Sequence, residues 1–593
     1  MQNIDKTLQI KQTATKSTSR GPDIREAVSA DHHLTGSSDD ASVADASVAD
    51  AFVADASVAA NDAELDPATR AKVDSISKTS ELLRFALSTV GIYLASPLMS
   101  LIDTSAVGTC SSNICLAALG PASILCDYAY YLNTWIGVAM TNLHARSVAE
   151  RDKKSAKDVI NTGIKLSVAS GLFITVFVSA LAAPMVKAYT GAVAEQLLPH
   201  AVEYMRIRAL GFPAALVTMA SQAALLGARN SQVPLLAVAI ATLLNFFGDY
   251  FFVNKWGWGI GGAAWATVIS QYAGMFAILP LQQRAFRKLR QTWPETTKNE
   301  AKITASSASS SSSASSAASS SSSSSETGSS VDSAVFKAAV SKDVSKRSAL
   351  KDFLSFVVPV GSTIIGKLVL YLTLTHVAAS FGVTPLAAHQ VSLSLFYSLT
   401  PFCDTIGNTV QAFLPALKAY GIKAQAAFMS KMTMFGTIAG LSVASVAGIV
   451  STLFPYVFTR DVEVQRAIGR LAPLTTSSLL GHGMLLAAEG WMLSSDQKRD
   501  KEFLGNTYAA MMVVVPLAMA AVKHTGGGVQ ALWKVFAMFQ LSRLIIMRTR
   551  LHFRLKEEMK QAGFDDDPAR SGQQRINVLE QKQTKHSAVP NPA

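Results

Sequence analysis

The sequence predicts an all-α integral membrane protein with twelve transmembrane helices in two six-helix lobes. Hydrophobic residues make up 49% of the 593-residue chain and charged residues only 16%, whereas soluble domains average about 25% charged residues. About twelve apolar stretches of roughly 20 residues recur between short polar breaks, and this is the length that a helix needs to cross a bilayer. The two halves of the chain also repeat one another.

The apolar stretches are expected to be helices rather than strands of a barrel. Backbone groups in lipid must be hydrogen-bonded within the protein, and a helix satisfies them within a single segment. A membrane barrel would instead show segments of about ten residues with alternating hydrophobicity.

Short words recur in the two halves at nearly constant spacing. Leu116-Ala117-Ala118 matches Leu386-Ala387-Ala388 at a separation of 270 (386 − 116), and Gly137 matches Gly407 at the same separation (407 − 137). Trp265 and Trp533 are 268 apart (533 − 265). Six spans is an even number, so both copies have the same orientation in the membrane. Parallel repeats of this kind build transporters whose substrate site lies between the repeats.

Five regions follow from composition. Residues 1–80 are polar and are predicted to be disordered, 81–290 form the N-lobe, and 350–555 form the C-lobe. Residues 291–349 are a disordered linker that contains the serine-rich run from Ser306 to Ser325, and residues 556–593 are a disordered tail.

The net charge of +12 is not the signature of a nucleic-acid-binding protein, because the positive residues gather at alternate helix ends. Loops rich in Lys and Arg remain on the cytoplasmic or equivalent side of a membrane. Both termini and the linker then share that side. The positive residues that carry this orientation are Arg146, Arg151, Lys153, Lys154, Lys157, Arg229, Arg284, Arg287, Lys288, Arg290, Lys418, Lys423, Lys498, Arg499 and Lys501.

Two aspartates lie inside apolar spans, Asp103 in the first and Asp249 in the fifth. Placing an ionised carboxylate in hydrocarbon costs a free energy on the order of several kcal/mol unless another group compensates the charge. Chains that keep such groups commonly use them to move protons or ions. The structural alternative is a hydrogen-bonded carboxylate at a contact between helices.

Other polar side chains are expected to surround these acids as an ion-coupling site. Asn245 and Asp249 are four residues apart and therefore lie on one face of a helix. Thr267 adds a hydroxyl from the sixth span and Tyr204 another from the fourth. Such a cluster can hold a proton or a monovalent cation.

A second set of polar residues marks candidates for a substrate cavity: Asp127, Lys367, His389, Gln390 and Asp404. Lys367 lies deep in the seventh span and must be paired or face water. Either it pairs with Asp404 or another acid, or it attracts an anionic substrate. A lone histidine such as His389 is as readily a packing or capping group as a ligand.

No sequence motif for ATP use or catalysis is found, because P-loop, HExxH and GxSxG patterns are all missing from the chain. We therefore expect no enzymatic activity, no cofactor and no bound metal centre, and uphill transport would draw on an ion gradient.

Over residues 84–555 the chain resembles the multidrug and toxic compound extrusion (MATE) family, and most closely its DinF-like and plant chloroplast-envelope branch, whose best-known member exports salicylate. The resemblance rests on the words at 97–104, 116–121, 126–128, 259–267, 387–391, 411–415 and 489–490, together with Asn245 and Asp249. Gln222 departs from the asparagine expected there, and Asp404 stands where this branch tends to have glutamate.

The resemblance implies two lobes around a central cleft, alternating access, and coupling through Asp103 and Asp249 to protons or sodium. The leading hypothesis is an antiporter that exports small organic molecules, with an organic anion such as an aromatic carboxylate favoured. Alternatives are an exporter of amphipathic cations and a flippase for lipids or lipid-linked sugars. We expect a monomer in the lipid bilayer that binds a small organic substrate and no nucleic acid. The plastid envelope is the expected membrane, with the plasma and vacuolar membranes as alternatives.

Overall fold

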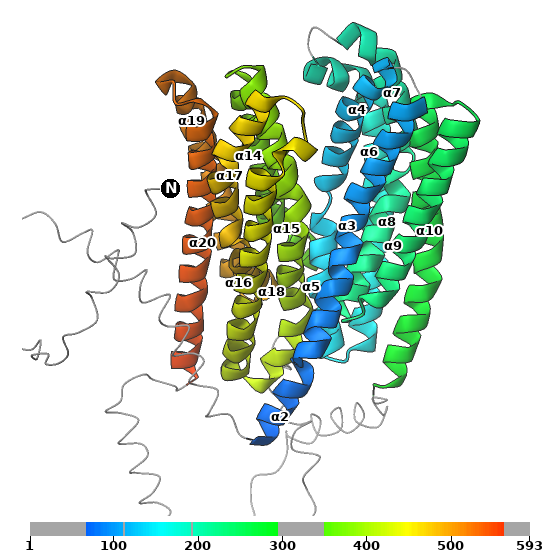
Figure 1. Cartoon of the computed structure of the whole chain (residues 1–593). Coiled ribbons are helices and arrows are strands. Elements are labelled where there is room, and N and C mark those ends of the chain that lie inside the picture. Colours follow the sequence, from blue (N-terminus) through cyan, green and yellow to red (C-terminus); the bar gives the residue numbers. More distant parts are fainter. Residues whose placement is uncertain (1–66, 111–112, 191–193, 294–348, 563–593) are drawn as a thin grey trace, which may run out of the picture. The chain divides into compact units, whose positions relative to one another are not determined.

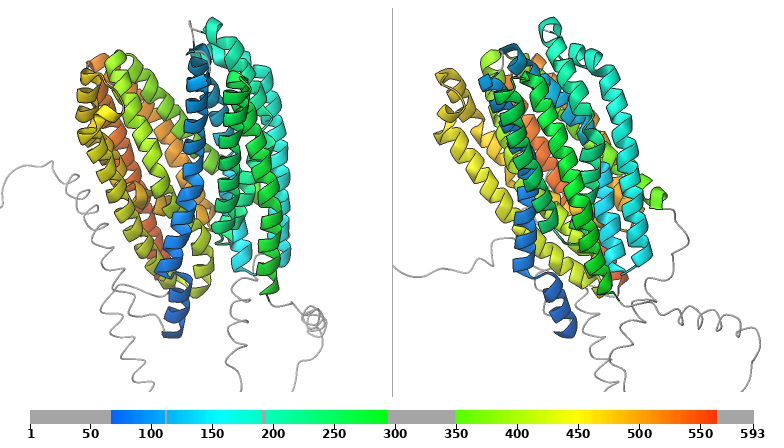
Figure 2. Two further views of the ribbon diagram at one scale, coloured as in Figure 1. Left: turned by 45° about the vertical axis from the view of Figure 1, so that its right-hand side comes forward. Right: turned by 90° about the vertical axis from the view of Figure 1, so that its right-hand side faces the viewer.

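The computed structural model describes residues 67–110, 113–190, 194–293 and 349–562, and within these ranges the chain forms helices and no strands. The helices of the N-terminal half lie side by side as one bundle, and those of the C-terminal half form another (Figures 1 and 2). This confirms the predicted fold class.

The N-lobe begins with a short helix that precedes the first long one. Its elements are α2 (Pro67–Ile76), α3 (Thr79–Cys110), α4 (Asn113–Tyr131), α5 (Trp135–Ala149), α6 (Lys153–Thr190), α7 (Ala194–Ala209), α8 (Phe212–Gly227), α9 (Gln232–Asp249), the π-helix η3 (Tyr250–Lys255) and α10 (Gly259–Gln291).

The C-lobe repeats this order with fewer breaks. Its elements are α13 (Ala349–Leu354), α14 (Val357–Ala379), α15 (Val383–Leu417), η4 (Lys418–Tyr420), α16 (Ile422–Leu453), η5 (Pro455–Val457), α17 (Val462–Leu480), α18 (His482–Ser494), α19 (Lys498–Thr525) and α20 (Gly528–Gln561).

Within the described ranges, the helices add up to the predicted twelve spans when each broken pair is counted as one span. Eight helices in the described ranges are individually long and apolar enough to cross a membrane, and α7 with α8 makes a ninth span that bends by 48°. The pairs α4–α5 and α17–α18, together with α15, complete the twelve. The bend in α7–α8 lies at Leu210–Gly211, just before Pro213, because proline has no N–H to continue the helical ladder.

Close packing in the C-lobe depends on glycine at a helix crossing. A Cβ atom placed on Gly483 of α18 would lie 2.2 Å from the carbonyl oxygen of Gly436 on α16. Real Cβ atoms do not approach a backbone oxygen so closely, so only glycine lets these two helices meet at this distance.

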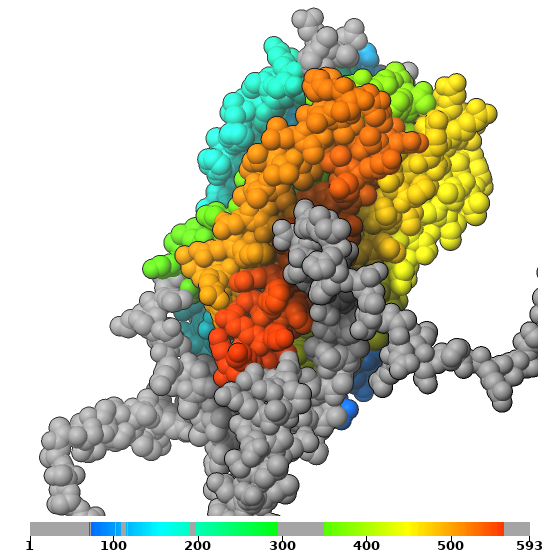
Figure 3. Space-filling view, turned by 90° about the vertical axis from the view of Figure 1, so that its left-hand side faces the viewer, coloured from blue at the N-terminus to red at the C-terminus, as the bar shows by residue number. Residues whose placement is uncertain are grey.

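The outer surfaces are apolar, as helices facing lipid require. Figure 3 shows one face of the molecule, on which α19 (orange) lies at the surface above the end of α20 (red). The exposed side chains of α19 include Val513, Val514 and Leu517. Such a surface fits the hydrocarbon core of a bilayer and would be costly in water.

The helices extend beyond the predicted boundaries, by one or two residues at α3, α10 and α13 and by more at the two ends of the described chain. Helix α2 lies within the segment 1–80 that is predicted to be disordered, and Val73 is buried in a core that is formed largely by the C-lobe. The segment 67–76 is short and polar, so its composition does not indicate that Val73 is buried. At the other end α20 runs to Gln561, beyond the predicted limit at residue 555. Residues 1–66, 294–348 and 563–593 lie outside the described residues, and so does the predicted disorder there.

Candidate functional site

Four of the five predicted ion-coupling residues lie together inside the N-lobe. The Asn245 amide of α9 donates a hydrogen bond to Asp103 Oδ1 at 3.2 Å, and the Thr267 hydroxyl of α10 donates to Asp103 Oδ2 at the same distance. All four side chains are buried, Asp103 at 6% exposure and Asn245, Asp249 and Thr267 at 1% or less. We call these four residues the acidic cluster.

The carboxyl groups of Asp103 and Asp249 lie close enough to interact with each other. Two ionised carboxylates are both acceptors, so this contact is a hydrogen bond only when one of them carries a proton. The rest of the described chain brings no donor to either oxygen of Asp249, and Asn245 Oδ1 is also buried without a partner. The acidic cluster therefore offers several unpaired oxygens to one proton or one small cation.

The fifth predicted residue, Tyr204, is buried but does not hydrogen-bond the acidic cluster. Its hydroxyl accepts a long hydrogen bond of 3.4 Å from Arg208 Nε, one turn further along α7. Arg208 also forms an ion pair with Asp127, at 3.6 Å between Nη2 and Oδ1, and it interacts electrostatically with Asp103. Arg208 thus connects Tyr204 and Asp127 with the acidic cluster.

The C-lobe contains a second cluster of charged groups, around Glu489. Arg543 Nη2 of α20 forms an ion pair with Glu489 Oε1 at 3.0 Å, and the Tyr508 hydroxyl donates to the same oxygen at 2.6 Å. Arg543 also donates to the Tyr508 hydroxyl and to Gln540 Oε1. Lys367 Nζ lies 4.0 Å from Glu489 Oε2, and Asp404 is within electrostatic range of both.

The partner of Lys367 is therefore Glu489, the "another acid" of the sequence-based alternative, rather than Asp404. Lys367 Nζ also lies over the Tyr508 ring, 5.5 Å from its centroid. Because Arg543 contacts Glu489 at a shorter distance, Lys367 is the more loosely held of the two cations, and 24% of its side chain is exposed.

The two remaining substrate-cavity candidates lie away from these charges. His389 is fully buried between Thr375 and Trp533, and its ring nitrogens lie 3.1 Å from the Thr375 hydroxyl and 3.3 Å from Trp533 Nε1. These contacts favour the packing alternative for His389. Its neighbour Gln390 is exposed at the start of α15.

The two lobes contact each other near the end where α10 ends and α13 begins, which we call the linker end. The Asn142 amide of α5 donates to Gln411 Oε1 of α15 at 2.8 Å, and the Ser494 hydroxyl of α18 donates to Asn142 Oδ1 at 3.1 Å. Closer to the surface, Arg146 pairs with Asp496 at 3.2 Å. Hydrogen bonds and an ion pair therefore hold the lobes together at this end.

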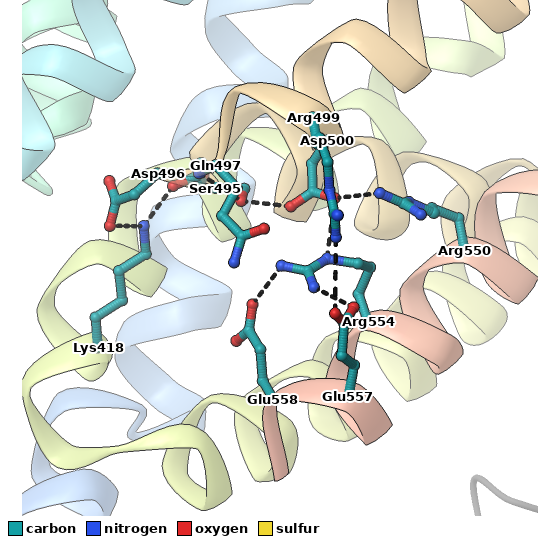
Figure 4. A network of polar contacts seen from close by, with 11 residues as sticks. Lys418, Ser495, Asp496, Gln497, Arg499, Asp500, Arg550, Arg554, Glu557 and Glu558 are labelled. Carbon is teal, nitrogen blue, oxygen red and sulfur yellow. Dashed lines mark hydrogen bonds and ion pairs between the residues drawn. The ribbon is translucent and has the colours of Figure 1, made fainter. Parts of the chain in front are cut away.

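Asp496 belongs to a larger polar network of the C-lobe at the linker end (Figure 4). Lys418 Nζ binds Asp496 Oδ2 at 2.9 Å and the Ser494 carbonyl oxygen at 2.6 Å. Deeper in this network the buried Asp500 accepts from Arg550, Arg554 and Ser495. Burial would raise the pKa of Asp496, but the nearby Lys418 and Arg146 outweigh it and hold that pKa below its ordinary value.

A cavity of about 670 Å³ opens on the outside of the N-lobe, between α6, the break of α7–α8 and α10. Its lining is apolar and includes Leu172, Pro213, Trp265 and Phe276, and it does not include any residue of the acidic cluster.

Sequence reasoning did not single out Arg208, Arg543 or Tyr508. Arg208 and Arg543 lie inside predicted spans. Only the packing of the helices shows which charged groups they contact. A signal did exist for Arg208, since it lies three residues before the Gly211-Phe212-Pro213 word that breaks the span.

A family model named MatE matches residues 89–251. Protein DETOXIFICATION 47, chloroplastic, of Arabidopsis thaliana is 29% identical over 476 residues, which cover 79% of this chain and 77% of that protein. Protein DETOXIFICATION 44, chloroplastic, of the same plant is 24% identical over 398 residues, 65% of this chain and 66% of that protein.

Among solved structures, a crystal structure of MATE in the bent conformation aligns with a TM-score of 0.63 at 17% identity. The alignment covers 83% of this chain and 99% of that one. At this identity the likeness establishes the fold alone, a membrane protein of two six-helix lobes.

Proposed function

Since this chain belongs to the MATE family of transporters, we propose that it is a secondary active antiporter that exports small organic molecules in exchange for protons or sodium ions. Transport proceeds by alternating access, in which the substrate site opens first to one side of the membrane and then to the other. The protein works as a monomer in the lipid bilayer and needs no cofactor.

The observation that carries this proposal is the acidic cluster. Asp103 and Asp249 are buried close to each other inside the N-lobe, where two adjacent negative charges repel strongly because the dielectric is low. One proton or sodium ion relieves that repulsion and gives the unpaired oxygens of Asp249 a partner. The cluster is thus stable with an ion bound and unstable without one, as a coupling site requires.

Coupling requires that the ion binds one orientation of the lobes more strongly than the other. The contacts of Asn142 with Gln411 and of Arg146 with Asp496 hold the linker end closed. These contacts must separate when the substrate site opens to that side. Ion binding at Asp103 and Asp249 changes the packing of α3 against α9 and α10 and so shifts the balance between the two orientations.

An organic anion is the favoured substrate. Lys367 supports this choice, because its ammonium group lies inside the C-lobe, 4.0 Å from an acid that Arg543 already neutralises at 3.0 Å. The competing candidate is an amphipathic cation, which Asp103, Asp127 and Asp249 of the N-lobe would attract.

The plastid envelope is the membrane that fits best, since the two Arabidopsis relatives are named chloroplastic. The Lys- and Arg-rich linker end would then face the stroma, the side equivalent to the cytoplasm.

The proposal is tested by flux into vesicles that contain the purified full-length chain, under imposed proton or sodium gradients. Asp249→Asn should abolish gradient-driven transport of a labelled aromatic carboxylate while the folded protein remains in the membrane. Asp158→Asn, an exposed acid at the linker end of α6, is the matched control and should transport normally. Full gradient-driven export by Asp249→Asn would contradict the proposal.

A further inference from the structure

Arg208 lies at a break inside the membrane. It is close to the C-terminus of α7, two residues before Leu210, where the span bends by 48° into α8. In transporters, broken helices at membrane depth place polar groups at the substrate site. The Arg208 side chain is only 15% exposed. A charged side chain at such a break must either be fully paired or take part in the function of the protein.

Two of the three nitrogen atoms of the Arg208 guanidinium form hydrogen bonds with nearby side chains. Nε donates to the Tyr204 hydroxyl at 3.4 Å. On the other side, the Gln271 amide takes the orientation that satisfies both its groups, so that its oxygen accepts from Nη1 at 2.8 Å and its nitrogen donates to the Gly211 carbonyl at 3.3 Å. Tyr204 of the same helix and Gln271 of α10 thus hold the guanidinium in place, and Nη2 is left for another partner.

Within the described helices, the ion-pair partner of Nη2 is a loosely held acid. Its distance of 3.6 Å from Asp127 Oδ1 exceeds that of a hydrogen bond. The Asp127 side chain is 62% exposed, although it lies in the span formed by α4 and α5. One turn further along α4, Tyr131 is within electrostatic range of Asp404 and Arg543 of the C-lobe. This part of α4 therefore faces the other lobe, where a substrate would lie.

We propose that Arg208 is the N-lobe contact for the carboxylate of an organic anion, and that this carboxylate displaces Asp127 from Nη2. The proposal rests on the proposed function and deepens it by naming a residue that selects the charge of the substrate. A substrate carboxylate that approaches Nη2 can form a charge-assisted hydrogen bond, which is shorter and stronger than the present ion pair. Asp127 then acts as a competitor that keeps the guanidinium neutralised while the site is empty.

The competitor role makes an unusual prediction, because removing a charge from the site should improve binding. Asp127→Asn removes both the competing carboxylate and its repulsion of the incoming anion, so the affinity for benzoate should rise about three- to tenfold. Arg208→Gln should lower it at least tenfold, and Arg208→Lys should lower it less because the charge is kept.

The experiment measures binding of labelled benzoate to the purified full-length chain in lipid nanodiscs, with benzylammonium as the cation of the same ring size. Arg206→Gln is the matched control, since Arg206 lies two residues earlier on α7, is exposed and donates a hydrogen bond of 3.4 Å to the Ser179 carbonyl oxygen. It should bind benzoate as the unmodified chain does. Thermal unfolding of each variant separates loss of binding from loss of fold.

The double variant Asp127→Asn, Arg208→Gln gives the sharpest readout. If Asp127 competes for Arg208, removing Asp127 brings no gain once Arg208 is gone, and the two effects are strongly non-additive. Equal gains from Asp127→Asn with and without Arg208 would overturn the proposal.

Failure of this inference can be told apart from failure of the proposed function. If the unmodified chain binds benzoate and Arg208→Gln binds it equally well, the assignment of Arg208 is wrong while anion export stands. If the unmodified chain binds benzylammonium and no benzoate, the assignment fails together with the preference for an anion, whereas ion-coupled export through Asp249 is unaffected.

Discussion

The indole N–H of Trp533 points at His389 Nδ1 across 3.3 Å, from α20 to α15. Tryptophan can only donate, so Nδ1 must be the acceptor and the proton of the imidazole must be on Nε2. That proton is then donated to the Thr375 hydroxyl at 3.1 Å. His389 is therefore a neutral ring that ties α14, α15 and α20 together inside the C-lobe.

His389→Leu should lower stability and leave substrate affinity unchanged. The substitution leaves the buried Trp533 N–H without an acceptor, at a cost of about 1–3 kcal/mol. Thermal unfolding in detergent measures the first effect and benzoate binding the second. A loss of binding without a loss of stability would return His389 to the substrate cavity.

Lys367→Ala should weaken transport of an aromatic carboxylate far more than transport of a cation of the same ring size. The ion pair of Arg543 with Glu489 remains in this variant, so Glu489 keeps a cationic partner. Paired flux measurements of benzoate and benzylammonium test the difference. Equal effects on both would remove the argument that Lys367 selects an anion.

Asp496→Asn should make the chain slightly less stable at neutral pH. Asp496 has a pKa below its ordinary value because of Lys418 and Arg146. Its stabilising contribution is therefore present above the ordinary pKa of an aspartate and is lost as the pH falls through the lowered, folded-state value. The side chain is 54% exposed, so the effect is about 1 kcal/mol or less.

Thermal unfolding of Asp496→Asn and of the unmodified chain should differ at pH 7 and converge in acid. High salt should also reduce the difference, because the pair with Arg146 is exposed on both sides. A difference that grows towards acid pH would show that another role of Asp496 dominates.

Gly483→Ala should destabilise the C-lobe strongly. The new Cβ would lie 2.2 Å from the Gly436 oxygen, and forcing two backbones apart costs typically 1–3 kcal/mol, or more in a tight crossing. Gly469→Ala is the control, since a Cβ there meets nothing within 4 Å. Similar unfolding temperatures for both variants would contradict the close crossing of α16 and α18.

Much of the fold follows from hydrophobic length and repetition, since lipid permits few alternatives to helices. The breaks within spans were not predicted, although Gly211-Phe212-Pro213 and Gly481-His482-Gly483 are words that interrupt helices. An average over twenty residues hides such a break. These segments are important because the break between α7 and α8 determines where Arg208 lies in the membrane.

The acidic cluster was predictable in part. Spacing along one helix brings Asn245 and Asp249 to one face, but only packing brings Asp103 and Thr267 to them. Spacing could not foresee that Lys367 meets Glu489, which lies 122 residues further along the chain (489 − 367). Nor could it foresee that His389 would be enclosed by Thr375 and Trp533, because partners of this kind depend on how helices distant in sequence cross.

Helix α10 ends and α13 begins at one end of the molecule, and each lobe holds its own charged cluster. Nothing in the described helices obliges the two lobes to be one polypeptide. Cut between Gln291 and Ala349, the chain would yield two fragments with six crossings each, in the same orientation, which could find each other again through Asn142, Gln411 and Ser494. Co-production of the two fragments would then restore a carrier whose halves are free to be exchanged, labelled or mutated one at a time.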